Sequence, residues 1–299
     1  MRLRSTALET PSRGAPLDGG SRHVARDGLD LVQRGEQPDA EIDAHRRVND
    51  ASTADAAYPH ETNAINTAGI APPHHPASLL LSRGDPRIDP RVVAAFETEG
   101  ETPAGVRGLR GTLSSHWHGD SPEDRRAVAL VGMDPSVDVA TVAANLAVVS
   151  AQIGWRTLLV DGDLQAPAQS ALFRVPADEG LSTLLHAPGT GRAALQPTAI
   201  DRLMLLPAGP PPSNPVELLE RQPLLEALDG RIGRHRLLLL SLSTRAQSSR
   251  FGAIDAILNG FDGVILVANR HHSGLRPLQR LTDVLQERNV PVLATAVLP

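Results

Sequence analysis

The chain contains neither lysine nor cysteine. All 29 basic residues among its 299 residues are arginine. Without lysine the protein cannot form a Schiff base, which excludes pyridoxal-phosphate and lysine-aldolase chemistry. An intact Walker P-loop and the strand lysine of protein kinases are excluded for the same reason. Without cysteine, thiol nucleophiles, disulfides, iron–sulfur clusters and thiolate zinc sites are excluded as well.

Aromatic residues and long apolar runs are also scarce. Aromatics make up 2% of the chain and its formal net charge is −5, so neither base stacking nor a basic surface points to nucleic acid. No run of roughly 18 apolar residues is present, and we therefore expect no direct membrane span. The first residues lack the apolar core of a signal peptide, so we expect a cytoplasmic protein.

The chain divides into two regions of different composition. Residues 1–124 contain 13 arginines and 19 acidic residues, whereas residues 125–299 contain 16 arginines and 15 acidic residues. Up to about residue 76 no sustained apolar period is visible, so this stretch cannot bury enough apolar surface to fold alone. We predict a long disordered, low-complexity region over residues 1–100 and a folded domain over residues 101–299. Within the first region, residues 78–81 and 91–96 are expected to form isolated helical turns or docking segments.

Six short apolar runs in the second region predict buried strands, and amphipathic stretches that predict helices separate most of them. The predicted strands are residues 127–131, 157–160, 203–206, 237–240, 263–267 and 292–297, and the predicted helices are 141–153, 215–228, 251–258 and 275–287. Continuous apolar strands alternating with helices predict an α/β fold, a parallel sheet with helices on both faces. At the helix starting at Pro215, Asn214 is the expected N-cap and Glu217 is at the third helical position.

In such a sheet, ligands bind outside the carboxyl ends of the strands. The loops after Val131, Val160, Leu240 and Val267 are therefore the expected location of a site. The first of these loops, residues 132–140, resembles a phosphate-binding loop in its position but has a single glycine. Its two aspartates would repel a triphosphate, so the pattern alone predicts a plain connection between strand and helix.

Asp161 and Asp163 follow the second apolar run. Two carboxylates at positions i and i+2 at the end of a strand are reasonable ligands for Mg²⁺ or for a water molecule. Aspartates at strand ends also cap the next turn. Both interpretations stay open, and the pattern alone favours the cap.

The order of these segments resembles a known family. The segments VAANLA (142–147), LLVDGD (158–163), LPAGP (206–210), NPVELL (214–219) and FDGVILV (261–267) closely follow the bacterial tyrosine-kinase family. Its members are the cytoplasmic ATPase domains of polysaccharide co-polymerases of the capsule and exopolysaccharide type, which are deviant-Walker P-loop relatives of the MinD and ParA ATPases. The LPAGP and NPVELL segments distinguish this branch from MinD and ParA themselves. The resemblance covers about residues 104–299.

Carried over position by position, the resemblance shows what this chain has lost. Val139 falls at the P-loop lysine of the family, and Asp138 at the glycine before it. Ala140 falls at the magnesium-binding serine or threonine, and Ser241 at the Walker B aspartate. Replacement of lysine by arginine throughout a genome would leave arginine at position 139, so Val139 indicates a local loss.

The second Walker motif is retained in part. Asp161 and Asp163 are kept, and they are the residual candidates for holding a nucleotide or Mg²⁺, but the arginine usual two residues later is Gln165. The family's kinases also carry a C-terminal cluster of tyrosines, whereas this chain has one tyrosine, Tyr58. Loss of one preorganised charge donor typically costs about 10²–10³ in rate, and several are changed here. The resemblance thus implies no catalytic residues at 139, 140 and 241, and no cofactor.

We therefore expect a non-catalytic regulatory or scaffolding subunit in exopolysaccharide or capsule synthesis and export. The resemblance implies a membrane polysaccharide co-polymerase as partner, a peripheral position at the inner face of the membrane through that partner, and a homo-oligomer as one arrangement. One alternative is an active ATP-dependent tyrosine autokinase that uses arginine in place of lysine, although residues 132–141 contain no arginine. A positioning ATPase of the ParA or MinD kind is a second alternative, but neither a basic surface nor an amphipathic membrane helix is visible.

Overall fold

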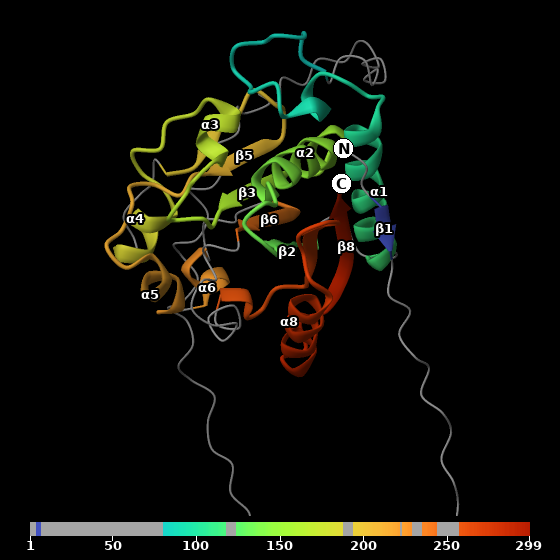
Figure 1. Ribbon diagram of the computed structural model, residues 1–299. Coiled ribbons are helices and arrows are strands. Elements are labelled where there is room, and N and C mark those ends of the chain that lie inside the picture. The colour runs from blue at the N-terminus through green and yellow to red at the C-terminus, as the bar shows by residue number, and fades with distance from the viewer. Residues whose placement is uncertain are drawn as a thin grey trace, which may run out of the picture.

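A single eight-stranded sheet forms the centre of the domain (Figure 1). The computed structural model describes residues 4–6, 80–117, 124–187, 194–221, 223–228, 235–243 and 257–299. The strand order is β1-β8-β7-β2-β6-β3-β5-β4. The strands are β1 (Arg4–Thr6), β2 (Arg126–Gly132), β3 (Thr157–Asp161), β4 (Gln196–Pro197), β5 (Leu203–Leu206), β6 (Leu237–Leu242), β7 (Gly263–Asn269) and β8 (Val292–Leu298).

All six predicted strands are confirmed, and the sheet that they form is parallel. The pairs β7–β8, β2–β7, β2–β6, β3–β6 and β3–β5 are parallel, and only the short edge strands β1 and β4 pair antiparallel with their neighbours. Every residue of β3, β5 and β6 is buried. Strands that are buried on both faces require apolar side chains at consecutive positions, which is why they are visible in the sequence as continuous apolar runs.

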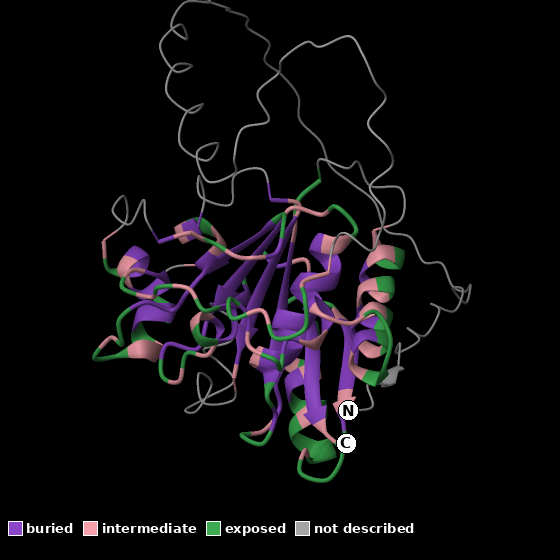
Figure 2. Ribbon diagram, turned by 90° about the horizontal axis from the view of Figure 1, so that it is seen from above, coloured by how far each residue is buried: buried purple, intermediate pink, exposed green. Residues whose placement is uncertain are grey.

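Helices cover both faces of the sheet, as predicted (Figure 2). One face carries the 3₁₀ helix η3 (Val93–Ala95) with α1 (Glu101–His116), α2 (Val139–Gln152) and α3 (Gln169–Phe173). The other carries α4 (Leu181–His186), α5 (Pro215–Glu220), α6 (Leu224–Leu228) and α8 (Leu275–Glu287). Among the described helices, none is long and apolar enough to cross a bilayer.

Two helix predictions need correction. The helix predicted over residues 215–228 is two helices, α5 and α6. Pro223, which has no N–H for a helical hydrogen bond, lies between them, directly before α6. Asn214 does occupy the N-cap, but its side chain makes no cap hydrogen bond and donates instead to Glu217 Oε2 at 3.1 Å. Of the helix predicted over residues 251–258, only the end from Ile257 lies within the described residues.

Residues 80–97, here called the strap, pack against α2 and belong to the folded domain. Ile88, Val92 and Ala94 are buried in the core on this face. The buried amide of Asn145 accepts a hydrogen bond from Ala94 N at 2.8 Å and donates to Arg91 O at 3.0 Å. The predicted docking segment at residues 91–96 is therefore confirmed.

The predicted boundary at residue 101 is correspondingly too late, since residues 80–100 are ordered. Arg4–Thr6 also departs from the predicted disordered region, because these residues form β1 against β8. The remainder of that region, residues 1–3 and 7–79, lies outside the described residues.

The start of α4 packs directly against the LPAGP segment (206–210). The N–H groups of Leu181 and Ser182 donate to the carbonyl oxygens of Pro207 and Ala208, each at 2.8 Å. The approach is so close that a Cβ on Gly180 would lie 2.2 Å from the Pro207 oxygen. The first turn of α4 is thus fixed to the chain that leaves β5.

We predict that Gly180→Ala destabilises the domain by more than about 2 kcal/mol, because the added methyl group meets backbone atoms that cannot yield. Gly111→Ala is the matched control, since Gly111 is within α1 and its Cβ would meet nothing within 4 Å. The control should stabilise by about 0.5–1 kcal/mol. Urea unfolding of the two variants measures both effects, and equal stability of the two would contradict the packing described here.

Candidate functional site

A cavity of about 220 Å³ lies at the carboxyl ends of β2, β3 and β6. It is lined by residues from the three loops that follow these strands, as predicted for three of the four candidate loops. The fourth loop, after β7, adjoins the cavity through a hydrogen bond from Ser273 Oγ to Asp134. The lining residues are Asp134, Pro135, Val137, Asp138, Val139, Ala140, Asp161, Asp163, Ala166, Ala168, Ser241 and Ser243.

The ionisable residues of this lining are all acidic. Four aspartates line the cavity, and no lining residue is basic. An anionic ligand would therefore face carboxylates with no arginine or histidine among the lining residues to offset them.

The loop after β2 ends in a helix cap that the sequence analysis missed. Asp138 is the N-cap of α2, and its carboxylate accepts hydrogen bonds from Thr141 N at 3.0 Å and Thr141 Oγ1 at 2.7 Å. The first contact satisfies the N–H group of Thr141, which an anion could otherwise bind at this helix N-terminus. An aspartate three residues before a threonine, ahead of an apolar helix, is a recognisable cap signal.

Val139 and Ala140 are structural residues of the same turn. Val139 is 3% exposed and belongs to the core between α2 and the sheet. The Ala140 carbonyl accepts a hydrogen bond at 3.0 Å from the side-chain nitrogen of Gln169, which is fully buried. Gln169 was missed because nothing in its sequence context marks a buried amide.

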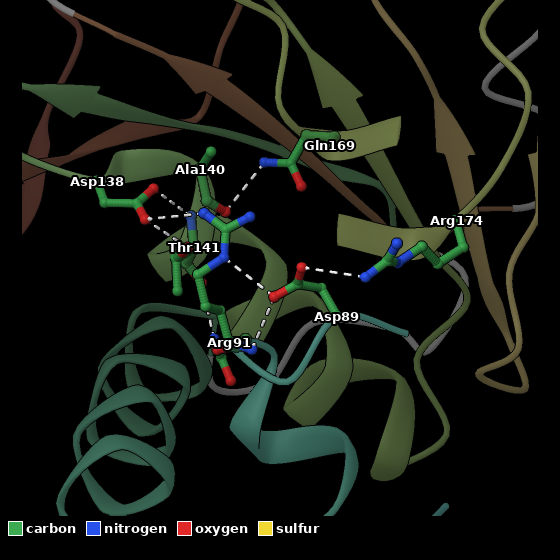
Figure 3. Close-up of polar contacts among 8 residues, drawn as sticks. Asp89, Arg91, Asp138, Ala140, Thr141, Gln169 and Arg174 are labelled. Carbon is green, nitrogen blue, oxygen red and sulfur yellow. Dashed lines mark hydrogen bonds and ion pairs between the residues drawn. The ribbon is translucent and has the colours of Figure 1, made fainter. Parts of the chain in front are cut away.

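An ionic chain connects the strap to the start of α2 (Figure 3). Arg91 lies between Asp89, at 3.0 Å, and Asp138, at 3.8 Å, while Arg174 at the end of α3 contacts Asp89 at 3.5 Å. The hydrogen bond from Arg91 is the main cause that lowers the pKa of Asp89. More than half of the Arg91, Asp138 and Arg174 side chains is exposed, so these ion pairs orient the loop and add little stability.

Asp161 is buried at the bottom of the cavity, with 1% of its surface exposed. Its Oδ2 accepts hydrogen bonds from Ala168 N at 3.0 Å and Gln169 N at 2.9 Å, and its Oδ1 accepts one from Asp163 N at 3.2 Å. Burial raises its pKa to about 7, an effect that these three hydrogen bonds oppose. Both oxygens are therefore engaged in holding the loop after β3.

Asp163 also holds this loop. Its Oδ1 accepts hydrogen bonds from Gln165 N at 3.1 Å and Ala166 N at 2.9 Å. This geometry is what the capping interpretation of the pair requires. Among the residues that the structure describes, no group of three histidine, aspartate or glutamate side chains is placed to hold a metal ion.

Ser241 pairs in register with Asp161 on the neighbouring strand and is 2% exposed. Its carbonyl accepts a hydrogen bond from Gly162 N at 2.9 Å. A Cβ on Gly162 would come within 2.9 Å of this oxygen and closer still to two leucine side chains of β6. The loop after β3 thus packs directly against the end of β6.

Two relatives that match part of the chain are named tyrosine-protein kinases. It is 31% identical over 142 residues to the tyrosine-protein kinase YwqD of Bacillus subtilis, which is 48% of this chain and 58% of the relative. It is 30% identical over 139 residues to the tyrosine-protein kinase wzc of Salmonella typhimurium, 46% of this chain and 19% of the relative. The matched stretches thus span less than two thirds of these relatives. No protein-family model matches the chain.

The fold has solved counterparts as well. The kinase domain of the Escherichia coli tyrosine kinase ETK superposes with a TM-score of 0.59 at 19% identity, over 71% of this chain and 80% of that domain. This likeness shows the fold. Together with the named relatives, it confirms the resemblance read from the sequence.

The buried carboxylate makes the stability of the domain depend on pH. The pKa of Asp161 is about 7 in the folded state and near 3.9 when unfolded. Between these two pH values the folded state therefore binds a proton that the unfolded state does not. We predict that the free energy of unfolding falls as pH rises from about 4 to about 7, by a few kcal/mol at one pKa unit per about 1.4 kcal/mol. Asp161→Asn should remove this part of the slope, as measured by urea unfolding across the pH range.

Asp283→Asn, on the exposed face of α8, is the control and should keep the wild-type slope. A wild-type slope in Asp161→Asn would contradict the assignment.

The cap at Asp138 is tested separately. Asp138→Ala should cost about 1 kcal/mol of unfolding free energy, because Thr141 N loses its acceptor, whereas Asp138→Ser should retain most of the stability. Thermal unfolding compares the two variants. Equal losses in both would show that the carboxylate does not act as a cap.

Proposed function

We propose that this chain of the bacterial tyrosine-kinase family is a non-catalytic regulatory or scaffolding subunit. The pathway that we propose is the synthesis and export of exopolysaccharide or capsule, and the partner is a membrane polysaccharide co-polymerase. Its place would be at the inner face of the membrane, held there through that partner.

The observation that carries the proposal is the cavity at the P-loop position. Phosphoryl transfer depends on positive charge and N–H donors aimed at the phosphates. Here the lining holds four carboxylates and no basic residue, and the first turn of α2 is bound by Asp138. The residues present do not fit Mg·ATP, since Val139 lies in the core, Ala140 has no hydroxyl for a metal and Ser241 has no carboxylate.

The volume of the cavity and the hydrogen bonds of its aspartates also support a non-catalytic role. A cavity of about 220 Å³ is below the roughly 300–1,000 Å³ of typical ligand pockets. Asp161 and Asp163 are the acidic pair kept from the family, and their oxygens accept backbone N–H groups of their own loop. We therefore propose that the pair has a structural role and that the domain acts through its surfaces.

Active kinase function is the second candidate, because the relatives are named tyrosine-protein kinases. It would require a cation at the phosphates that comes from outside the described lining. Phosphotyrosine that accumulates on the purified protein in the presence of Mg·ATP would favour this candidate.

We predict that millimolar Mg·ATP leaves the melting temperature of the full chain unchanged. A ligand at 100 times its Kd would add about 2.7 kcal/mol of stability, an easily visible shift. A kinase of the family measured in parallel is the positive control. A rise in melting temperature that Asp161→Ala abolishes would overturn the proposal.

A further inference from the structure

Three polar side chains from two neighbouring strands meet in the cavity at the carboxyl edge of the sheet. Asp163 follows β3, Ser241 lies near the end of β6, and Ser243 directly follows that strand. All three line the cavity. Ser241 and Ser243 are two residues apart, which is the spacing that places side chains on the same side of a strand.

Each of these three side chains has an oxygen without a hydrogen-bond partner. The Ser241 side chain is 2% exposed, and its hydroxyl makes no hydrogen bond with the described residues. The Oγ of Ser243 is buried and has no partner either. Asp163 uses Oδ1 for both of its hydrogen bonds to the loop, and Oδ2 makes none with the part of the chain that the structure describes. Because buried polar groups in proteins are nearly always paired, these oxygens indicate a ligand that donates hydrogen bonds.

The charge of the cavity favours a cation as that ligand. Of the four lining aspartates, only Asp138 forms an ion pair with a described residue, Arg91 at 3.8 Å. Asp134 accepts hydrogen bonds from the uncharged side chains of Ser136 and Ser273. Water could donate hydrogen bonds to the three unpartnered oxygens, but only a cation also offsets the carboxylates.

The unpartnered oxygens match the donors of a protonated primary amine. An ammonium group has three N–H donors and no acceptor, whereas a guanidinium group has five donors in one plane. A metal ion fits less well, because Mg²⁺ and Ca²⁺ take six or more oxygen ligands. Among the described residues, no three acidic or histidine side chains are placed to hold a metal ion.

The volume of the cavity, about 220 Å³, limits such an amine to a short chain. A water molecule takes about 30 Å³ in the liquid, so a chain of six non-hydrogen atoms fills roughly 180 Å³. A diamine with four carbons has this size. Its second ammonium group would face Asp134 and Asp138, which line the same cavity from the loop after β2.

We propose that the cavity binds a short aliphatic diamine in its doubly protonated form. One ammonium group donates hydrogen bonds to Asp163 Oδ2, Ser241 Oγ and Ser243 Oγ. The backbone hydrogen bonds that Asp163 Oδ1 accepts remain in place and hold the loop. This inference rests on the proposed function in one respect, which is that Mg·ATP does not occupy the cavity. It gives the non-catalytic domain a small-molecule ligand.

Isothermal titration calorimetry of the full chain with butane-1,4-diamine tests this site. Tetramethylammonium at equal ionic strength is the control, because it carries a positive charge but has no N–H group. We expect saturable binding of the diamine below about 10 mM and no binding of tetramethylammonium. Equal binding of the two cations would mean general attraction and would overturn the inference. Absence of diamine binding would also overturn it and would leave the proposed function standing, because Mg·ATP tests that function separately.

Variants of the lining locate the bound amine. Asp163→Asn keeps an oxygen acceptor for the loop but loses the charge, and Ser241→Ala removes a hydroxyl that has no protein partner, so the domain should stay folded. Each should bind the diamine about 10-fold more weakly, the effect of one hydrogen bond to a charged group. Asp283→Asn, on the exposed face of α8, should bind as the wild type does. Unchanged binding in either cavity variant, or equal weakening in all three, would overturn the inference.

Magnesium chloride is titrated alone in the same way, to separate an amine site from a metal site. We expect the diamine to saturate the cavity at a lower concentration than Mg²⁺ does, because Asp163 Oδ2 is the one carboxylate oxygen that the serine hydroxyls accompany. Saturation by Mg²⁺ at the lower concentration, abolished by Asp163→Asn, would identify a metal site and overturn the inference.

Discussion

The first turn of an α-helix has N–H groups with no hydrogen-bond partner in the helix. Which group accepts these hydrogen bonds at α2 determines whether the loop before it needs a ligand. In a phosphate-binding loop an anionic ligand can take that place. Here the Asp138 carboxylate accepts a hydrogen bond from one of these groups, Thr141 N, and another from the Thr141 hydroxyl. The next two residues are also part of the packed structure. Val139 is buried in the core, and the Ala140 carbonyl accepts a hydrogen bond from the buried side-chain amide of Gln169. The loop is thus a packed connection that needs no ligand to be ordered.

The two edges of the sheet carry different side chains. At the carboxyl edge the loops meet around four aspartates, and at the amino edge arginines lie beside two tryptophans whose rings are tilted by 45° to each other. Between the edges the strands are buried on both faces.

The strands and the long helix α8 could be predicted from the sequence because burial dictates their composition: a strand covered on both faces must be apolar throughout, and α8 must bury one stripe. The strap could not, since its docking depends on a polar group, the buried Asn145, which bonds to backbone atoms some fifty residues away. The Asp138 cap was visible as an aspartate three residues before Thr141 but was interpreted only as a charge that repels phosphate. Asp161 and Asp163 were placed correctly at a strand end, whereas their hydrogen bonds to the loop backbone depend on how that loop folds back onto β6.

The central claim is that the chain's own carboxylate takes the place of a phosphate at the start of α2. The amide resonances of Val139, Ala140, Thr141 and Val142 report on this turn directly. In a two-dimensional ¹⁵N–¹H spectrum of the full chain, we expect these resonances to stay in place when Mg·ATP is added to millimolar concentration and to move when Asp138 is replaced by alanine. Saturable shifts of these four amides with Mg·ATP in the wild-type protein would contradict the account.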